Sequence, residues 1–119
     1  MGDKAEVKEF AKPDEVRTFE RGQVELISIG DGEVGRFTLQ PGWHWAEHIK
    51  HLVGTDLCEQ PHFQTILSGT IHVKMADGTE FDAGPGSVLK IPPGHDAWIV
   101  GDEALVAIDW TGAENYAKG

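Results

Sequence analysis

The sequence predicts a small all-β domain, built from short strands that are joined by tight turns. Glycine and proline recur at short intervals, in GDGEVG, QPGW, DGTEF, AGPGS, IPPGHD and VGDE. The runs between these turns are rich in Val, Ile, Phe, Thr and Trp, which are residues that favour strands. Short strands at this spacing indicate a sandwich or a closed barrel and not a series of βαβ units.

Nine strands are expected, each a run of strand-favouring residues that ends at a turn. They are Val24–Ile29, Val34–Leu39, Trp43–His48, His62–Leu67, Thr70–Met75, Thr79–Asp82, Ser87–Ile91, Ala97–Val100 and Leu105–Trp110. The turn ADGTE predicts a hairpin, because Asp77 and Gly78 can supply the positive φ angles of a tight turn. A helix is expected only in residues 112–118, GAENYAK.

The organisation is that of one domain with short extensions. A chain of 119 residues is long enough to bury its own core. Residues 1–22 mix charged and apolar positions around Pro13 and predict an N-terminal arm or edge segment that could pack against a partner subunit. Residues 23–112 then form the barrel, and residues 113–119 form a short C-terminal tail.

Charge and motif content exclude several function classes. The chain has 20 acidic and 10 basic residues, a formal net charge of −10, which would repel phosphate backbones and anionic membrane surfaces. It contains no G-x-S-x-G, P-loop, G-x-G-x-x-G or C-x-x-C motif. We therefore expect neither nucleic acid nor a membrane as a partner.

A cytoplasmic location is expected from the N-terminus and from the cysteine content. The first 16 residues have no apolar core region and do not resemble a signal peptide. Cys58 is the single cysteine of the chain, so an intrachain disulfide cannot form. A thiolate ligand for a soft metal is available in a reducing compartment.

The first candidate site lies in the stretch GTDLCEQPHFQTILSG. Strand alternation places Asp56, Cys58, His62 and Gln64 on one face, although Pro61 can bend the chain within it. Thiol, imidazole and carboxylate groups are ligands of zinc and related ions. The alternative interpretation is that Cys58 is a small buried apolar residue and His62 is hydrogen-bonded to a carbonyl group.

The second candidate site is the stretch GWHWAEHIKH. Alternation places His44 and His48 on one face and Trp43 and Trp45 on the other. In the alternative interpretation, the two tryptophans build a core or a subunit interface and the histidines are exposed. His72 alternates with apolar neighbours and is expected at the surface.

The third candidate is the pair His95 and Asp96, which follows the rigid turn IPPG. A neighbouring imidazole and carboxylate could support acid–base chemistry near neutral pH. The alternative is that Asp96 only accepts hydrogen bonds from local backbone amides. We favour the second interpretation, because adjacent residues of a strand point to opposite faces.

Two motifs resemble those of the cupin superfamily, specifically its small single-domain conserved-barrel (cupin 2) type. GPGSVLKIPPGHDAW is similar to the second cupin motif, with Gly86, Pro92 and Gly94 at its fixed positions. QPGW and HFQTILSGTIHV resemble the first motif, with Gly69 as its closing glycine. The resemblance covers roughly residues 23–110 and implies a double-stranded β-helix, or jelly-roll, barrel.

The resemblance also implies a metal-ligand set. Cupins carry His-x-His-x-x-x-Glu before the closing glycine, and here Asp56, Cys58 and His62 fall at these three positions. The family's fourth ligand, a histidine, falls on Ala97, which cannot bind a metal.

A second register begins at Gly42 and brings His48 into the lumen beside His62, with Lys50 at the partner position. His95 or His44 could supply the missing fourth ligand from the opposite wall.

Two functions therefore remain open. In the first, Cys58, His62 and one or two of His48, Asp56 and His95 hold a divalent zinc, nickel, iron or copper ion for metal-assisted oxidation, isomerisation or hydrolysis. In the second, the barrel is a non-catalytic binding or sensing module without metal. Either function implies a small polar ligand and, from the resemblance, a homodimer. The residues expected around the pocket or at its mouth are Gln64, His44, His95, Trp98, Trp43 and Trp45.

Overall fold

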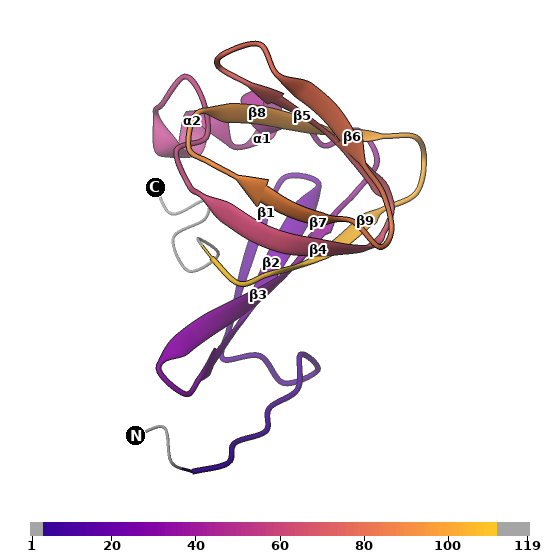
Figure 1. Cartoon of the computed structure of the whole chain (residues 1–119). Helices are drawn as coiled ribbons and strands as arrows, with labels where there is room; N and C mark the ends of the chain where they lie inside the picture. The colour runs from indigo at the N-terminus through magenta and orange to yellow at the C-terminus, as the bar shows by residue number, and fades with distance from the viewer. Residues whose placement is uncertain (1–3, 112–119) are drawn as a thin grey trace.

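Two antiparallel β-sheets face each other in the computed structural model, which describes residues 4–111 (Figure 1). The large sheet has the strand order β1-β2-β3-β9-β4-β7, and the small sheet has the order β6-β5-β8. The strands are β1 (Glu15–Phe19), β2 (Gly22–Ile29), β3 (Gly32–Leu39), β4 (His62–Ser68), β5 (Thr70–Met75), β6 (Glu80–Ala83), β7 (Val88–Ile91), β8 (His95–Val100) and β9 (Leu105–Asp109). Two short helices, α1 (Trp45–His48) and α2 (Lys50–Val53), connect β3 to β4. The predicted all-β fold is confirmed.

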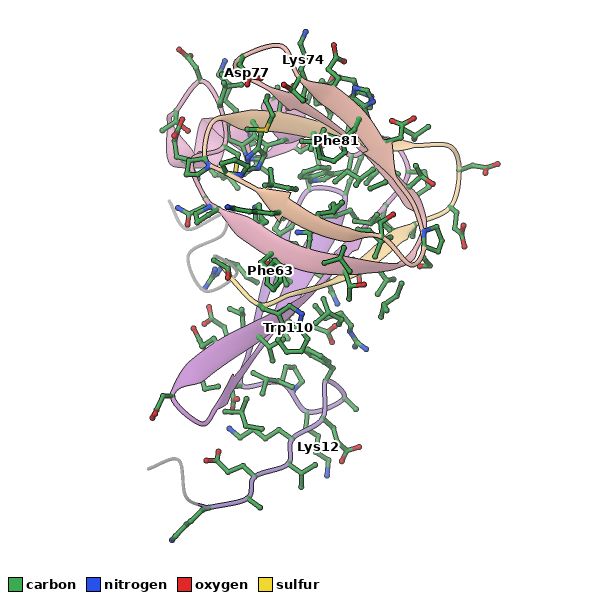
Figure 2. All side chains as sticks on the ribbon, viewed as in Figure 1. Lys12, Phe63, Lys74, Asp77, Phe81 and Trp110 are labelled. Carbon is green, nitrogen blue, oxygen red and sulfur yellow. The ribbon has the colours of Figure 1, made fainter. Side chains whose placement is uncertain are left out.

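Alternation along the strands builds the core between the sheets. In β4, His62, Gln64 and Ile66 are buried while Phe63 and Leu67 are exposed. In Figure 2, Phe63 and Trp110 lie on the side of β4 that faces away from the small sheet. The inward-facing apolar side chains of both sheets form one cluster. The buried polar residues of β4, β8 and β9 are His62, Gln64, His95 and Asp109.

The glycines of the two cupin-like motifs have backbone conformations that other residues rarely adopt. Gly69, Gly86 and Gly94 have φ angles of 77°, 88° and 93°. Gly69 joins β4 of the large sheet to β5 of the small sheet, and a Cβ atom there would lie 2.6 Å from the carbonyl oxygen of Ala104. The chain can therefore pass between the sheets at this point only with glycine.

The predicted strand Trp43–His48 is wrong. Only His44 forms a β-bridge, to Trp98, and the chain then turns into α1. The amides of Glu47 and His48 donate to the carbonyl of His44. Burial of Trp45, His48 and Ile49 follows a helical repeat, so the alternating tryptophans that suggested a strand mark the entry to a helix.

The N-terminal region contains a strand that sequence analysis assigned to the arm. β1 pairs antiparallel with β2 and is one edge of the large sheet. β2 begins at Gly22, one residue before the predicted barrel boundary at residue 23, and β1 begins at Glu15, eight residues before it. The predicted helix at 112–118 and the tail at 113–119 lie outside the described residues.

The predicted hairpin at ADGTE is present between β5 and β6, with a different turn conformation. Gly78 has a φ of 92°, but Asp77 does not have a positive φ. The Asp77 carboxylate instead accepts a hydrogen bond from the Thr79 amide at 2.9 Å, which closes the turn through a side chain.

No helix among the described residues is long and apolar enough to span a membrane. The homodimer and the cytoplasmic location stay predictions.

Candidate metal centre and its cavity

Three metal-capable side chains meet between the two sheets. Cys58, His62 and His95 each offer one ligand atom, and these atoms all lie within 4.8 Å of one another. All three residues are buried, with exposed fractions of 3%, 6% and 3%. His62 is the first residue of β4 in the large sheet and His95 is the first residue of β8 in the small sheet, so the cluster joins the two sheets.

Backbone pairing fixes Cys58 beside His95. Cys58 lies in the loop before β4 and forms an isolated antiparallel bridge to His95. Its amide donates to the His95 carbonyl at 2.8 Å, and its carbonyl accepts from the Gly94 amide at 2.8 Å. Because directly opposed residues of an antiparallel pair point to the same side, the thiol and the imidazole share one face.

The two imidazoles are oriented through their Nδ1 atoms. His62 Nδ1 forms a short hydrogen bond with the buried carboxylate of Asp109, and His95 Nδ1 lies 2.8 Å from the Pro92 carbonyl oxygen. A carbonyl oxygen can only accept, so Nδ1 of His95 carries the proton and Nε2 is its ligand atom. An imidazole whose other nitrogen is held by a carboxylate or carbonyl is the usual arrangement of a metal-binding histidine.

Sequence analysis missed Asp109. This residue is fully buried, and its carboxylate also accepts from Gln64 Nε2 at 3.2 Å and from the backbone amides of Phe63 and Thr111 at 3.2 and 3.0 Å. The signal was present in LVAIDW, because alternation places Asp109 on the same inward face as Leu105 and Ala107. A carboxylate at an inward position of an apolar strand requires a partner.

The electrostatics of the cluster link the thiol to the imidazoles. Burial raises the pKa of the Cys58 thiol, but its hydrogen bonds with His62 and His95 outweigh burial and lower that pKa below its usual value. Burial lowers the pKa of His62, but its hydrogen bonds with Asp109 and Cys58 raise it overall. The thiolate, the form of cysteine that binds metals, is therefore favoured here.

A small cavity adjoins the two histidines. It has a volume of about 30 Å³, room for about two water molecules. Its walls are mostly apolar, and its polar members are few. The lining residues include Phe37, Leu39, Trp43, Trp45, His62, Gln64, Ile91 and His95.

Trp43 is the exceptional member of this lining. Its side chain is buried, with 2% exposed. Its indole Nε1 is buried and has no hydrogen-bond partner among the described residues. Trp43 and Trp45 therefore belong to the cavity wall and the core, as the alternative interpretation of GWHWAEHIKH allowed, and not to a pocket mouth.

Asp56 and His48 do not join the cluster. Asp56 has a fully exposed side chain that lies 3.6 Å from Lys50, because the loop between α2 and Cys58 does not continue the alternation of β4. His48 is buried on α1, where its Nδ1 accepts from the His44 amide at 3.0 Å and its Nε2 lies 3.5 Å from Glu20.

His44 and Trp98 do not line the cavity, because they lie on the outer side of β8. Trp98 stacks on His72 with ring centroids 4.5 Å apart and contacts His44 edge-on at 5.0 Å. Asp96 accepts from the amides of Ala97 and Ala46 and lies 2.7 Å from His44 Nε2, so it attaches α1 to β8. His95 and Asp96 point to opposite faces, and they do not form an acid–base pair.

Comparison with solved structures identifies the architecture. The chain is similar to a cupin-2 domain protein from Rhodospirillum rubrum, with a TM-score of 0.55 and 23% identity over 87% of this chain and 64% of that one. A cupin-like protein from Thermotoga maritima matches with a TM-score of 0.53 and 17% identity over 77% and 68% of the two chains. This chain has the cupin fold.

A third similar structure is that of the polyketide cyclase RemF from Streptomyces resistomycificus, with a TM-score of 0.59 and 14% identity over 88% of this chain and 76% of that one. No protein-family model matches the sequence, and no curated protein shows significant similarity to it. At these identities the likeness extends to the fold alone, and the site must be argued from its own residues.

Within this cupin fold, the second imidazole of the cluster comes from His95, one of the two residues that sequence analysis offered in place of the family's fourth ligand. The resemblance assigned the fourth ligand to Ala97, which is buried on the inner face of β8. His95 lies two residues earlier on that same face, one step along the alternation. The donor set fits a divalent transition metal, since one thiolate and two imidazoles suit zinc, nickel, iron or copper better than magnesium or calcium.

Proposed function

We propose that Cys58, His62 and His95 bind a divalent transition metal, and that the protein acts on or binds a small polar molecule beside it. The observation that carries this proposal is the orientation of the two imidazoles by Asp109 and by the Pro92 carbonyl. A buried histidine needs a partner for its N–H even in a core, but filling core space does not require a thiol and two imidazoles to converge with their ligand atoms within 4.8 Å of one another.

Three protein ligands are the number found in catalytic sites, where a fourth position is open to water or substrate. A divalent metal bound here would supply Lewis acidity toward an oxygen of the small molecule. The protein residues supply the rest: Asp109 holds His62 in one tautomer and balances charge, while the apolar walls of the cavity limit the access of water. Oxidation, isomerisation and hydrolysis are all compatible with this arrangement.

Elemental analysis of protein purified without a histidine tag or a chelator tests the proposal. We expect about one metal per chain in the wild type, and a loss in Cys58→Ser, His62→Ala and His95→Ala. Asp56→Asn is the matched control and should keep the metal, because its side chain is fully exposed. A wild type that stays metal-free after reconstitution with zinc, nickel, iron and copper would contradict the proposal.

A second function is favoured by one observation. The cavity beside the two histidines is lined mainly by apolar side chains, so it could hold a small molecule by packing, without any metal. A non-catalytic binding barrel would be stabilised thermally by its ligand in the presence of a chelator. Detection of product from any stabilising ligand would exclude this second function.

A further inference from the structure

The outer face of the large sheet, the side that faces away from the small sheet, is apolar and uncovered. Five large apolar side chains stand on it with exposed fractions between 48% and 68%, namely Val16, Phe63, Leu67, Val88 and Trp110. Figure 2 shows Phe63 and Trp110 on this side, and the Trp110 amide donates to the Phe63 carbonyl at 2.8 Å. A contiguous apolar surface of this kind is typical of an interaction site.

The strand register shows that these side chains form one continuous surface. A cross-strand row of outward residues runs over the whole sheet from β1 to β7, through Val16, Glu25, Arg36, Ile108, Thr65 and Val88. On β4, Phe63 and Leu67 lie one alternation step from Thr65 on either side of this row. The patch therefore extends across the sheet and along its strands.

Charge distinguishes this face from the rest of an acidic chain. Among the outward positions of the six strands, Glu25 is the one carboxylate, and it accepts from Arg36 Nε at 2.7 Å. With Lys90 on β7, the face has two cations and one carboxylate, a charge of +1, whereas the chain has −10. The outer face of the small sheet carries Asp82 and Asp96. Two copies of the chain would thus meet with least repulsion through the large sheet.

We infer that the outer face of the large sheet binds the same face of a second copy of the chain, which gives a twofold-symmetric dimer. A sheet face with apolar side chains at alternate positions is complementary to another such face, as in sandwiches whose sheets pack about 10 Å apart. Pairing of like faces closes at two subunits and covers both patches. The metal centre is not required, because His62 and Cys58 lie on the inner side of this sheet.

The size of the face sets the expected affinity. Six strands about 4.8 Å apart and about 20 Å long give roughly 600 Å² per subunit before the relief of side chains is counted. A stable interface buries roughly 800 Å² per subunit, so the face is near the lower limit for a stable dimer. We therefore expect a dissociation constant in the micromolar range.

Sedimentation velocity from about 1 to 300 µM, in the presence of a chelator, tests the inference independently of the metal site. The wild type should approach twice the chain mass of 13.0 kDa at the higher concentrations. Leu67→Asp and Val88→Asp each place a carboxylate in the interface and should raise the dissociation constant at least about tenfold. Leu52→Asp on α2 and Val100→Asp on β8 are the matched controls at exposed positions elsewhere, and they should leave it unchanged.

Salt supplies a second readout. Raising the salt concentration from about 0.05 to 0.5 M should strengthen the dimer, because it screens the repulsion between two acidic chains. A dimer that salt dissociates would be held by ion pairs and would contradict the inference. A wild type that is monomeric at every concentration would overturn it, whatever else covers the face. A dimer that both Leu67→Asp and Val88→Asp leave intact would lie on another surface, such as the N-terminal arm, and would overturn it too.

Discussion

At the residue scale, Asp109 determines what His62 can do. It is fully buried and accepts hydrogen bonds from an imidazole, an amide side chain and two backbone amides. A buried carboxylate with this many donors is fixed in position. The His62 ring is thereby held in a single orientation relative to the Cys58 thiol.

Asp109→Asn should weaken metal binding about 10- to 100-fold, because it removes the charge that holds the His62 tautomer. A competition titration with a chromophoric chelator measures the affinity, and circular dichroism checks that the variant folds. Asp56→Asn, which makes the same chemical change at an exposed position, should bind metal as the wild type does. Equal affinities for both variants would contradict the role given to Asp109.

The sequence predicted part of this site for a physical reason. Cys58 and His62 were both assigned to the interior and both are buried, although Cys58 is positioned by its bridge to His95 and not by β4. Asp56 was assigned wrongly because alternation does not extend into an exposed loop. His95 and Asp109 come from strands distant in the chain, and which residues oppose Cys58 and His62 depends on strand pairing that no local pattern specifies.

At the element scale, the strands from β2 onward were predictable, whereas β1 and the link between β3 and β4 were not. Strand positions follow from turn residues and from β-branched runs, which act locally. In α1, by contrast, the pattern Trp-x-Trp suggested alternation, but Trp45 and His48 are buried on one helical face. Four residues are too few to distinguish the two repeats, and packing against β8 through Asp96 decides between them.

The pairing of β5 with β6 should depend on pH through His72. This residue lies between Asp82 and Glu80, at 2.6 and 2.8 Å, and hydrogen bonds to Glu80 and then Asp82 raise the pKa of its imidazole above 6.5. Because the folded pKa is the higher one, the stabilisation is complete below the unfolded pKa and is lost as the pH rises through the folded pKa.

Urea denaturation of the wild type and of His72→Gln measures this effect. The wild type should exceed the variant in stability by more near pH 5.5 than near pH 9. A difference in stability that is constant over this range would show that the imidazole charge contributes nothing to the pairing.

At the scale of the whole molecule, the candidate centre joins two sheets that otherwise meet through apolar packing. His62 belongs to the large sheet and His95 to the small sheet, with Cys58 bridged to the latter. A metal bound by all three would hold the sheets together in the folded state, whereas the unfolded chain offers no such preformed site. Metal binding should therefore appear as global stability, beyond any change at the site itself.

Zinc at about 1,000 times its dissociation constant should stabilise the fold by about 4 kcal/mol and raise the melting temperature by more than about 10 °C. Differential scanning calorimetry with and without zinc measures this shift, and a chelator should reverse it. His62→Ala removes the ligand of the large sheet, and His95→Ala removes the ligand of the small sheet. Each variant should therefore show no zinc-dependent shift, even if its melting temperature without zinc differs from that of the wild type. Asp56→Asn should retain it. If one of the two histidine variants kept the full shift, that histidine would not be a ligand, and the metal would not link the sheets.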